Sequence, residues 1–285
     1  RSSKKIKKTK KKSKIKKRSS KKIKKTKKKS KIKKKSSKKI SSAKKVNKTL
    51  SSELIFKTKQ EWIKNSLANK SQYQNKYNDS LKNNNSFWKK EGKRITWIKP
   101  YKKIKDVKYS KEEVKIKWFE DGTLNASQNC IDRHLKDKKD KTAIIWVGDD
   151  PNDTQKISYK QLHQKVSKAA NGLKKLGIQK GDRVTIYLTM IPELAILMLA
   201  CARIGAIHSI IFGGFSAESI SGRVNDCKSE YIITADEGVR GGKTIPLKAT
   251  TDEALNNCPN VKKCIVVKRT GNYVFWNNER DVWYH

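Results

Sequence analysis

Residues 205–250 read GAIHSIIFGGFSAESISGRVNDCKSEYIITADEGVRGGKTIPLKAT, and this stretch decides the fold. Residues 207–212 form a short, nearly unbroken apolar run rich in β-branched side chains, a pattern typical of a strand covered on both faces. Gly213 and Gly214 break the run, and a serine two residues later can cap a helix. Residues 231–234 then predict the next strand. The order of strand, turn, helix and strand indicates one repeat of an α/β fold.

The same alternation continues on both sides of this stretch. We expect strands at 143–147, 155–158, 184–188 and 264–267, and helices at 159–176 and 192–204. Strands that alternate with helices at this spacing require right-handed crossovers, which predicts a doubly wound, mainly parallel sheet. The strand at 155–158 is expected to pair locally with the one before it. The predicted fold class is therefore α/β.

A second glycine turn, residues 240–243 (RGGK), directly follows the strand at 231–234. Two turns after consecutive parallel strands lie at the same carboxyl edge of the sheet, where ligands of open α/β sheets bind. The first glycine pair lets the backbone approach a ligand, or it is only a tight turn that needs positive φ. Arg240 and Lys243 suit a multiply phosphorylated ligand, and the alternative is a solvated basic turn.

The charge of the chain is concentrated at its start. The net charge is +44, and residues 1–48 hold 28 Lys and Arg and no acidic residue, so the remainder carries +16. Residues 1–17 recur identically as 18–34. Such a repeat cannot bury a core, so we expect residues 1–50 to be disordered. Closely spaced lysines can bind nucleic acid without sequence preference, whereas A- and T-rich codons alone would also produce this composition.

The cysteines and the hydropathy pattern bear on the environment of the protein. Five cysteines show no paired spacing, which fits a reducing compartment better than disulfides or zinc. No uncharged apolar run reaches the length of a membrane span. We therefore predict a cytoplasmic protein without a membrane partner, and the pattern does not indicate an oligomeric state.

Residues 51–140 form a second region, rich in Lys, Asn and aromatic residues, with helices expected at 53–67 and 71–82. Its irregularly spaced aromatic residues look like anchors that hold a long segment on a larger body. Asp132, Arg133 and His134 have no nucleophile beside them, so we expect a structural ion pair and a hydrogen-bonded histidine. This division leaves residues 141–285 as the α/β domain.

Several stretches resemble AMP-forming acetyl-coenzyme A synthetase, a member of the adenylate-forming acyl-CoA synthetase superfamily. The resemblance covers residues 53–285, and its most recognisable pieces are NSFWKK, WFEDGTLNASQNCIDRHL, GDRVTIYLTMIPELAILMLACARIGAIHS, IFGGFSAESISGRVNDCKSEYIITADEGVRGGKTIPLK and RDVWYH. It implies that 51–140 is the amino-terminal extension of that family and that 141–285 is the amino-terminal part of its large AMP-binding domain.

The resemblance implies an activity and a coenzyme A (CoA) site. The family activates acetate with ATP and Mg²⁺ to acetyl-adenylate and then passes the acetyl group to CoA. By the resemblance, the residues that line the CoA site are Phe212, Gly213, Gly214, Arg240, Gly241, Gly242 and Lys243. Arg240 and Lys243 would bind CoA phosphates, and Phe212 would pack near the adenine. Lysine at 243, where many relatives have arginine, keeps the charge and loses the planar fork.

The phosphate loop and the adenylation lysine of that family are not found in residues 1–285. We therefore assign no catalytic, ATP-binding or metal residue, and we expect an incomplete amino-terminal portion that is inactive alone. Propionate:CoA ligase is the alternative enzyme, and a basic nucleic-acid-associated remnant is an alternative of another class. The sequence that follows His285 would separate them.

Overall fold

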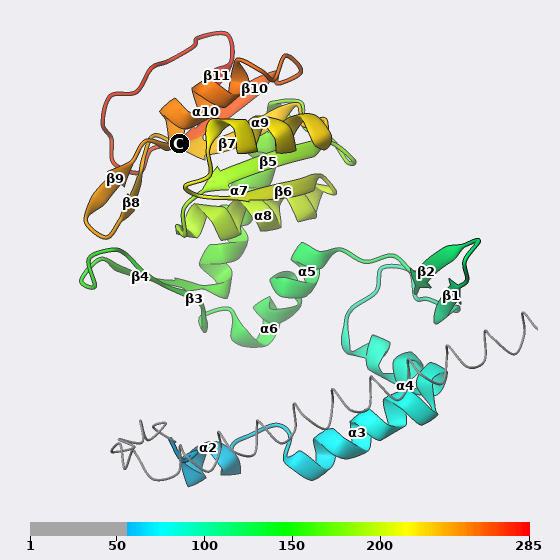
Figure 1. The fold of residues 1–285 in the computed structure, drawn as a ribbon. Helices are drawn as coiled ribbons and strands as arrows, with labels where there is room; N and C mark the ends of the chain where they lie inside the picture. Colours follow the sequence, from blue (N-terminus) through cyan, green and yellow to red (C-terminus); the bar gives the residue numbers. More distant parts are fainter. Residues whose placement is uncertain (1–55) are drawn as a thin grey trace, which may run out of the picture. The chain divides into compact units, whose positions relative to one another are not determined.

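The computed structural model describes residues 56–285, so the predicted tail at 1–50 lies outside the described residues. The chain divides into two compact units, residues 1–69 and 70–285. The described part of the first unit holds the short helix α2 (Gln60–Lys64). All other described elements belong to the second unit (Figure 1).

Short elements make up the first part of the second unit: helices α3 (Lys70–Lys82) and α4 (Asn84–Glu91), the 3-10 turn η1 (Gly92–Arg94), and an antiparallel hairpin of β1 (Lys105–Tyr109) and β2 (Val114–Trp118). The aromatic residues of this region pack on one another, with the rings of Trp88 and Trp118 5.6 Å apart and those of Trp97 and Phe119 also 5.6 Å apart. These four rings form a local cluster and do not pack in the core of the sheet, where anchors on a larger body would be expected.

The next segment is hydrogen-bonded to the α/β body. It comprises α5 (Ala126–Cys130), the 3-10 turn η2 (Asp132–His134) and α6 (Leu135–Lys138). The Asn125 side chain caps α5 and also donates to the carbonyl oxygens of Ala202 and Arg203, both at 3.1 Å. The predicted ion pair of Asp132 exists, and its partner is Arg203. The His134 ring packs against that of Tyr159, and the predicted hydrogen bond of this histidine side chain is not found among residues 56–285.

A hairpin and an amphipathic helix precede the main sheet. The hairpin pairs β3 (Thr142–Val147) with β4 (Thr154–Ser158) in antiparallel register, as predicted. Ser158 then begins α7 (Tyr159–Lys175) with a capping box, because its hydroxyl accepts from the Gln161 N–H while the Gln161 side chain accepts from the Ser158 N–H. The apolar face of α7 is buried as its periodicity predicts: Leu162, Val166, Ala169, Ala170 and Leu173.

The main sheet has five strands, all parallel, in the order β11-β10-β7-β5-β6. Its strands are β5 (Arg183–Leu188), β6 (Ile207–Phe212), β7 (Tyr231–Ala235), β10 (Lys263–Val267) and β11 (Asp281–Trp283). The connecting helices are α8 (Pro192–Ile204), α9 (Ala217–Asp226) and α10 (Leu247–Leu255). The helices α7 and α8 lie on one face and α9 and α10 on the other (Figure 1), which confirms the doubly wound α/β prediction.

The core lies between these layers, and its least exposed strands are β5, β7 and β10. Each fully buried aliphatic side chain there stabilises the fold by roughly 1.5–3 kcal/mol. The strand β6 differs from the expectation that both of its faces are covered, because it lies at the edge of the sheet. Ile207 and Phe212 are 56% and 61% exposed. An apolar run predicts a strand, but it does not reveal whether the strand has one neighbour or two.

Within residues 56–285 no helix is long and apolar enough to cross a membrane. All five cysteines lie in this part of the chain as free thiols, and burial raises the pKa of Cys201 and of Cys264 to about 12. These two thiols are therefore inert packing groups at neutral pH.

Candidate functional site at the carboxyl edge of the sheet

The ends of three neighbouring strands meet around Thr189, the residue after β5. A Cβ atom added to Gly213, after β6, would lie 3.2 Å from Thr189 Cγ2. A Cβ atom added to Gly238, which opens the hairpin after β7, would lie 2.6 Å from the same atom. The first predicted glycine turn and the base of the hairpin that carries the second thus approach the same residue at one edge, and Gly213 and Gly238 allow this because they lack a Cβ atom.

The first turn presents an aromatic ring beside an ordered backbone. Phe212 is 61% exposed, and its ring lies 6.1 Å from that of Phe215. Gly214 has a φ of +112°, so this position favours glycine. The Gly214 N–H donates to the Tyr187 hydroxyl (3.2 Å), which itself donates to the Phe215 carbonyl (3.1 Å). Buried Tyr187 therefore fixes the backbone that carries the exposed Phe212 ring.

The second turn is a regular hairpin of β8 (Gly238–Arg240) and β9 (Lys243–Ile245). Gly241 and Gly242, with φ of +59° and +70°, connect the strands, as a two-residue turn with positive φ at both central positions requires. Arg240 and Lys243 are direct cross-strand partners, so their side chains share one face of the hairpin. Both are exposed, and neither has an ion-pair partner within the described residues.

Asp149 is part of this site, and the sequence analysis did not predict it. Its two carboxylate oxygens accept hydrogen bonds from the Gly241 N–H (2.8 Å) and the Gly242 N–H (2.7 Å). These bonds, that of Gly242 first, lower the pKa of the Asp149 carboxyl. The acidic turn between two predicted strands is visible in the sequence. No local pattern links it to a glycine pair more than 90 residues away.

Asp236, at the end of β7, is a second carboxylate that the sequence did not single out. It is fully buried and accepts hydrogen bonds from the N–H groups of Glu237 (2.7 Å), Arg269 (2.8 Å) and Gly271 (2.8 Å). The bonds join the loop after β7 to the loop after β10. Asp236 therefore has a structural role, because backbone donors already occupy its oxygens.

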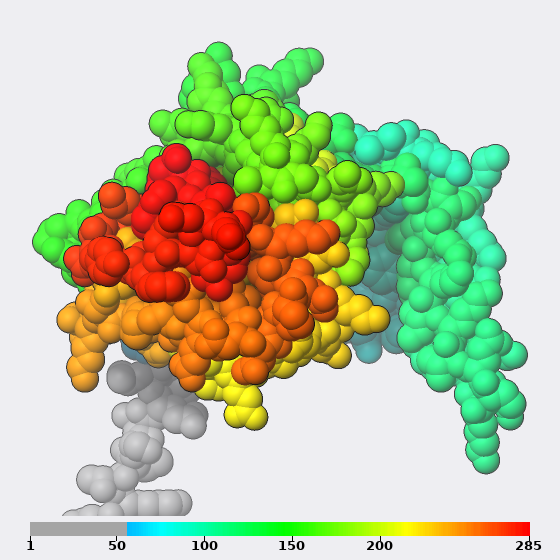
Figure 2. All heavy atoms as spheres, turned by 90° about the horizontal axis from the view of Figure 1, so that it is seen from above, coloured from blue at the N-terminus to red at the C-terminus, as the bar shows by residue number. Residues whose placement is uncertain are grey.

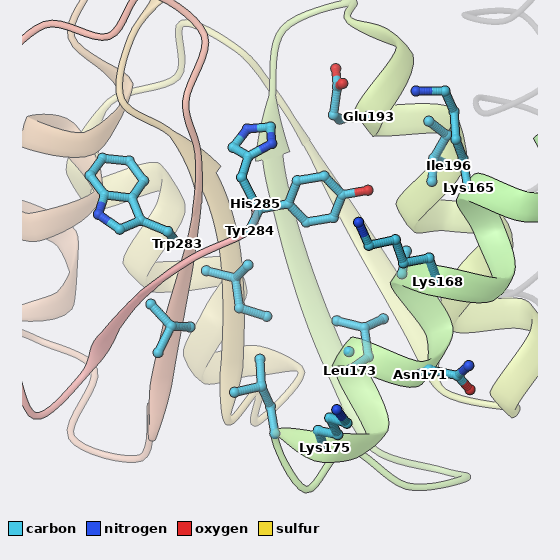
Figure 3. Close-up of a pocket in the computed structure, with 15 residues that line it drawn as sticks. Lys165, Lys168, Asn171, Leu173, Lys175, Glu193, Ile196, Trp283, Tyr284 and His285 are labelled. Atoms are coloured by element: carbon cyan, nitrogen blue, oxygen red, sulfur yellow. The ribbon is translucent and has the colours of Figure 1, made fainter.

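A cavity of about 860 Å³ lies elsewhere, between α7, α8 and the strands β10 and β11. Figure 3 shows Tyr284 pointing from the sheet toward α7, from which Lys165 and Lys168 extend. Burial raises the pKa of Tyr284 to about 12. In Figure 2 the carboxy-terminal segment is exposed at the surface beside the chain that carries β10. None of the seven residues predicted to bind CoA lines this cavity.

No group of three or more His, Cys, Asp or Glu side chains suited to a metal ion occurs among residues 56–285. The carboxyl edge offers two cations, two glycine turns, one exposed aromatic ring and the Asp149 carboxylate. Such a set can bind and orient a phosphorylated ligand, and it contains no nucleophile with an adjacent base.

The fold places the chain among the open, doubly wound α/β proteins, which bind ligands at the carboxyl ends of parallel strands. The family model described as "AMP-binding enzyme" matches residues 131–283, more than half of the chain, and the model described as "Acetyl-coenzyme A synthetase N-terminus" matches residues 73–130. The chain belongs to the AMP-binding enzyme family, and the resemblance drawn from the sequence is confirmed.

Curated relatives are named acetyl-coenzyme A synthetase, which is the family that the sequence resembles. An acetyl-coenzyme A synthetase of Parvibaculum lavamentivorans is 58% identical over 233 residues, which cover 82% of this chain and 36% of the relative. One of Methylocella silvestris is 54% identical over 234 residues, with the same coverage. The chain thus spans little more than a third of the length of these relatives. Acetoacetyl-CoA synthetase from Streptomyces lividans has a similar fold, with a TM-score of 0.65, 23% identity, and coverage of 73% of this chain and 31% of that one.

Proposed function

We propose that this chain is the amino-terminal portion of an AMP-forming acetate:CoA ligase, which converts acetate, ATP and CoA into acetyl-CoA, AMP and pyrophosphate. The observation that carries the proposal is the 58% identity to an acetyl-coenzyme A synthetase, which extends across both matched regions. The names of the relatives favour acetate over propionate as the acyl substrate. The proposed location is the cytoplasm.

Within that reaction we assign the carboxyl edge to CoA. Coenzyme A carries a diphosphate and a ribose phosphate beside its adenine, so it offers several anionic groups and one flat ring. Arg240 and Lys243 share one face of a short hairpin and have no ion-pair partner among residues 56–285, which suits phosphate binding. The exposed ring of Phe212 suits contact with the adenine. These residues bind and orient CoA for the second half-reaction.

ATP and Mg²⁺ take part in the first half of the proposed reaction. ATP supplies the adenylate that activates acetate, and Mg²⁺ neutralises phosphate charge. We assign no residue of this chain to either. The polypeptide of residues 1–285 is therefore expected to make no acetyl-adenylate by itself. The nucleic-acid alternative depends on the lysine repeat, which lies outside the described residues, and no described feature favours it.

The binding proposal is testable on residues 1–285 by calorimetric titration with CoA. The double variant Arg240→Ala/Lys243→Ala is expected to bind CoA more than about tenfold more weakly, because one charged hydrogen bond contributes roughly 1.5–3 kcal/mol. Lys90→Ala/Lys93→Ala is the matched control, since it removes the same charge at exposed positions of α4 and η1. Equal losses in both variants would show that the RGGK hairpin is not the CoA contact.

The catalytic proposal requires a chimera in which this chain replaces the corresponding third of the Parvibaculum enzyme. The chimera is expected to form acetyl-CoA. The double variant in it is expected to raise the KM for CoA while acetate-dependent pyrophosphate exchange continues, because only the second half-reaction uses CoA. Loss of both half-reactions in a folded double variant would show that the hairpin is structural.

A further inference from the structure

The glycine turn of the RGGK hairpin is held by a carboxylate from a distant loop. Asp149 accepts from both central N–H groups of the turn, at 2.8 Å from Gly241 and 2.7 Å from Gly242. One ionised carboxylate satisfies both donors, whereas an amide in its place would offer a single acceptor oxygen. The two glycine N–H groups are therefore not free to bind a ligand phosphate while Asp149 remains in place.

The loop that carries Asp149 is itself fixed to the carboxyl edge of the sheet. In the β3–β4 hairpin, the Trp146 indole N–H donates to the Met190 carbonyl, after β5, at 2.7 Å. The Arg269 guanidinium, after β10, lies 5.2 Å from the centre of the Trp146 ring and 3.4 Å from the Asp153 carboxylate. Loops after two strands of the sheet thus hold the β3–β4 hairpin, and the hairpin in turn holds the glycine turn.

The charges around the turn explain why such a support is useful. Arg240 and Lys243 are directly opposite each other, and like charges at cross-strand positions destabilise a hairpin. The β8–β9 hairpin is only three residues long on each side, so few backbone hydrogen bonds oppose this repulsion. The Asp149 carboxylate adds two hydrogen bonds and a negative charge at the tip, on the two glycines that separate the cationic residues.

We propose that Asp149 is a positioning residue for CoA binding: its carboxylate holds the Gly241–Gly242 turn so that Arg240 and Lys243 face the same phosphorylated ligand. The inference rests on the proposed CoA site. It assigns a favourable role to a negative charge beside an anion site, where electrostatics alone would make that charge unfavourable. Weaker CoA binding after removal of the Asp149 charge therefore supports positioning. Tighter binding would show that this charge competes with the phosphates of CoA.

The experiment compares Asp149→Asn with Asp150→Asn in the full chain by calorimetric titration with CoA. Both variants remove one negative charge from the same loop, and among the described residues the Asp150 carboxylate accepts hydrogen bonds only from Asn152. We expect Asp150→Asn to bind CoA as tightly as the wild type or slightly more tightly. We expect Asp149→Asn to bind about three- to tenfold more weakly, because the loop must then be ordered when the ligand binds. Asp149→Glu, which keeps the carboxylate, is expected to restore part of the affinity.

Amide NMR of the ligand-free chain supplies a second readout. The Gly241 and Gly242 N–H resonances are expected to shift in Asp149→Asn and not in Asp150→Asn, with equal melting temperatures for the two variants. A wild-type chain that binds CoA while Asp149→Asn binds it equally or more tightly would overturn the positioning role and leave the CoA proposal intact. A wild-type chain that does not bind CoA would overturn the CoA proposal and this inference with it.

Discussion

Arg203 and Asp132 form a two-pronged ion pair between segments that lie far apart in the sequence. Arg203 Nη1 lies 2.8 Å from Asp132 Oδ2, and Nη2 lies 2.7 Å from Oδ1. Asp132 belongs to the turn between α5 and α6, and Arg203 lies in the last turn of α8. His163 of α7 approaches the same carboxylate at 3.5 Å. The pair therefore fastens the segment that precedes the α/β body to the two helices on one face of the sheet.

Arg203→Ala is expected to destabilise the fold by about 1–3 kcal/mol, because it leaves the partly buried Asp132 carboxylate without its main donor. Urea unfolding followed by circular dichroism measures the effect. Lys136→Ala, which removes an exposed cation from the neighbouring helix α6, is the control and is expected to change stability by less than about 0.5 kcal/mol. Equal effects of the two substitutions would contradict the structural role of the pair.

The same ion pair predicts a pH dependence. Arg203 holds the pKa of Asp132 below the ordinary value of 3.8. A lowered folded-state pKa means that the stabilisation is fully present above the unfolded-state value and is lost as the pH falls through the folded-state value. The difference in unfolding free energy between the wild type and Asp132→Asn is therefore expected to be constant from about pH 7 to about pH 5 and to shrink below about pH 4. A difference that does not change down to about pH 3 would show that the charge of Asp132 is not responsible.

Alanine substitutions at two glycines are expected to change the stability of the fold in opposite directions. Gly238→Ala would place a Cβ atom 2.6 Å from Thr189 Cγ2, so we expect a loss of about 1–3 kcal/mol from overpacking at the carboxyl edge. Gly222→Ala, in the helix α9, meets no atom within 4 Å and has no positive φ. It is expected to stabilise the fold by roughly 0.5–1 kcal/mol, because alanine favours the helix. Thermal unfolding of both variants checks the contrast, and a tolerated Gly238→Ala would contradict the close approach.

The local sequence predicts much of the fold and only part of the site. Continuous apolar runs locate β5 and β7, because both faces of these strands are buried, and apolar periodicity locates the helix α7, because it buries one regular face. It does not predict α10, whose buried side includes Lys248 and Thr251 and so lacks a continuous apolar stripe. The RGGK turn is recognisable because two adjacent glycines require a special backbone. Asp149 cannot be recognised from the sequence, because its contact with the glycine turn depends on how the β3–β4 hairpin packs on the sheet.

Two carboxylates allow Lys248 to lie on the buried side of α10. Its side chain is fully buried, and Nζ lies 2.7 Å from Asp252 Oδ1, 2.9 Å from Asp281 Oδ2 and 3.0 Å from the Phe275 carbonyl. Arg280 contacts the same two carboxylates, so the network joins α10 to the start of β11.

Lys248→Met is expected to destabilise the fold by about 3 kcal/mol, the lower end for a broken buried ion pair, because Arg280 still compensates part of the charge. Lys262→Met, which removes only an exposed partner of Glu230, is the control and is expected to change stability much less than Lys248→Met does. Adding Asp281→Asn to Lys248→Met is expected to recover part of the loss, because the amide removes the uncompensated buried charge. A double variant that is less stable than Lys248→Met alone, by urea unfolding, would show that packing and not charge balance determines the cost.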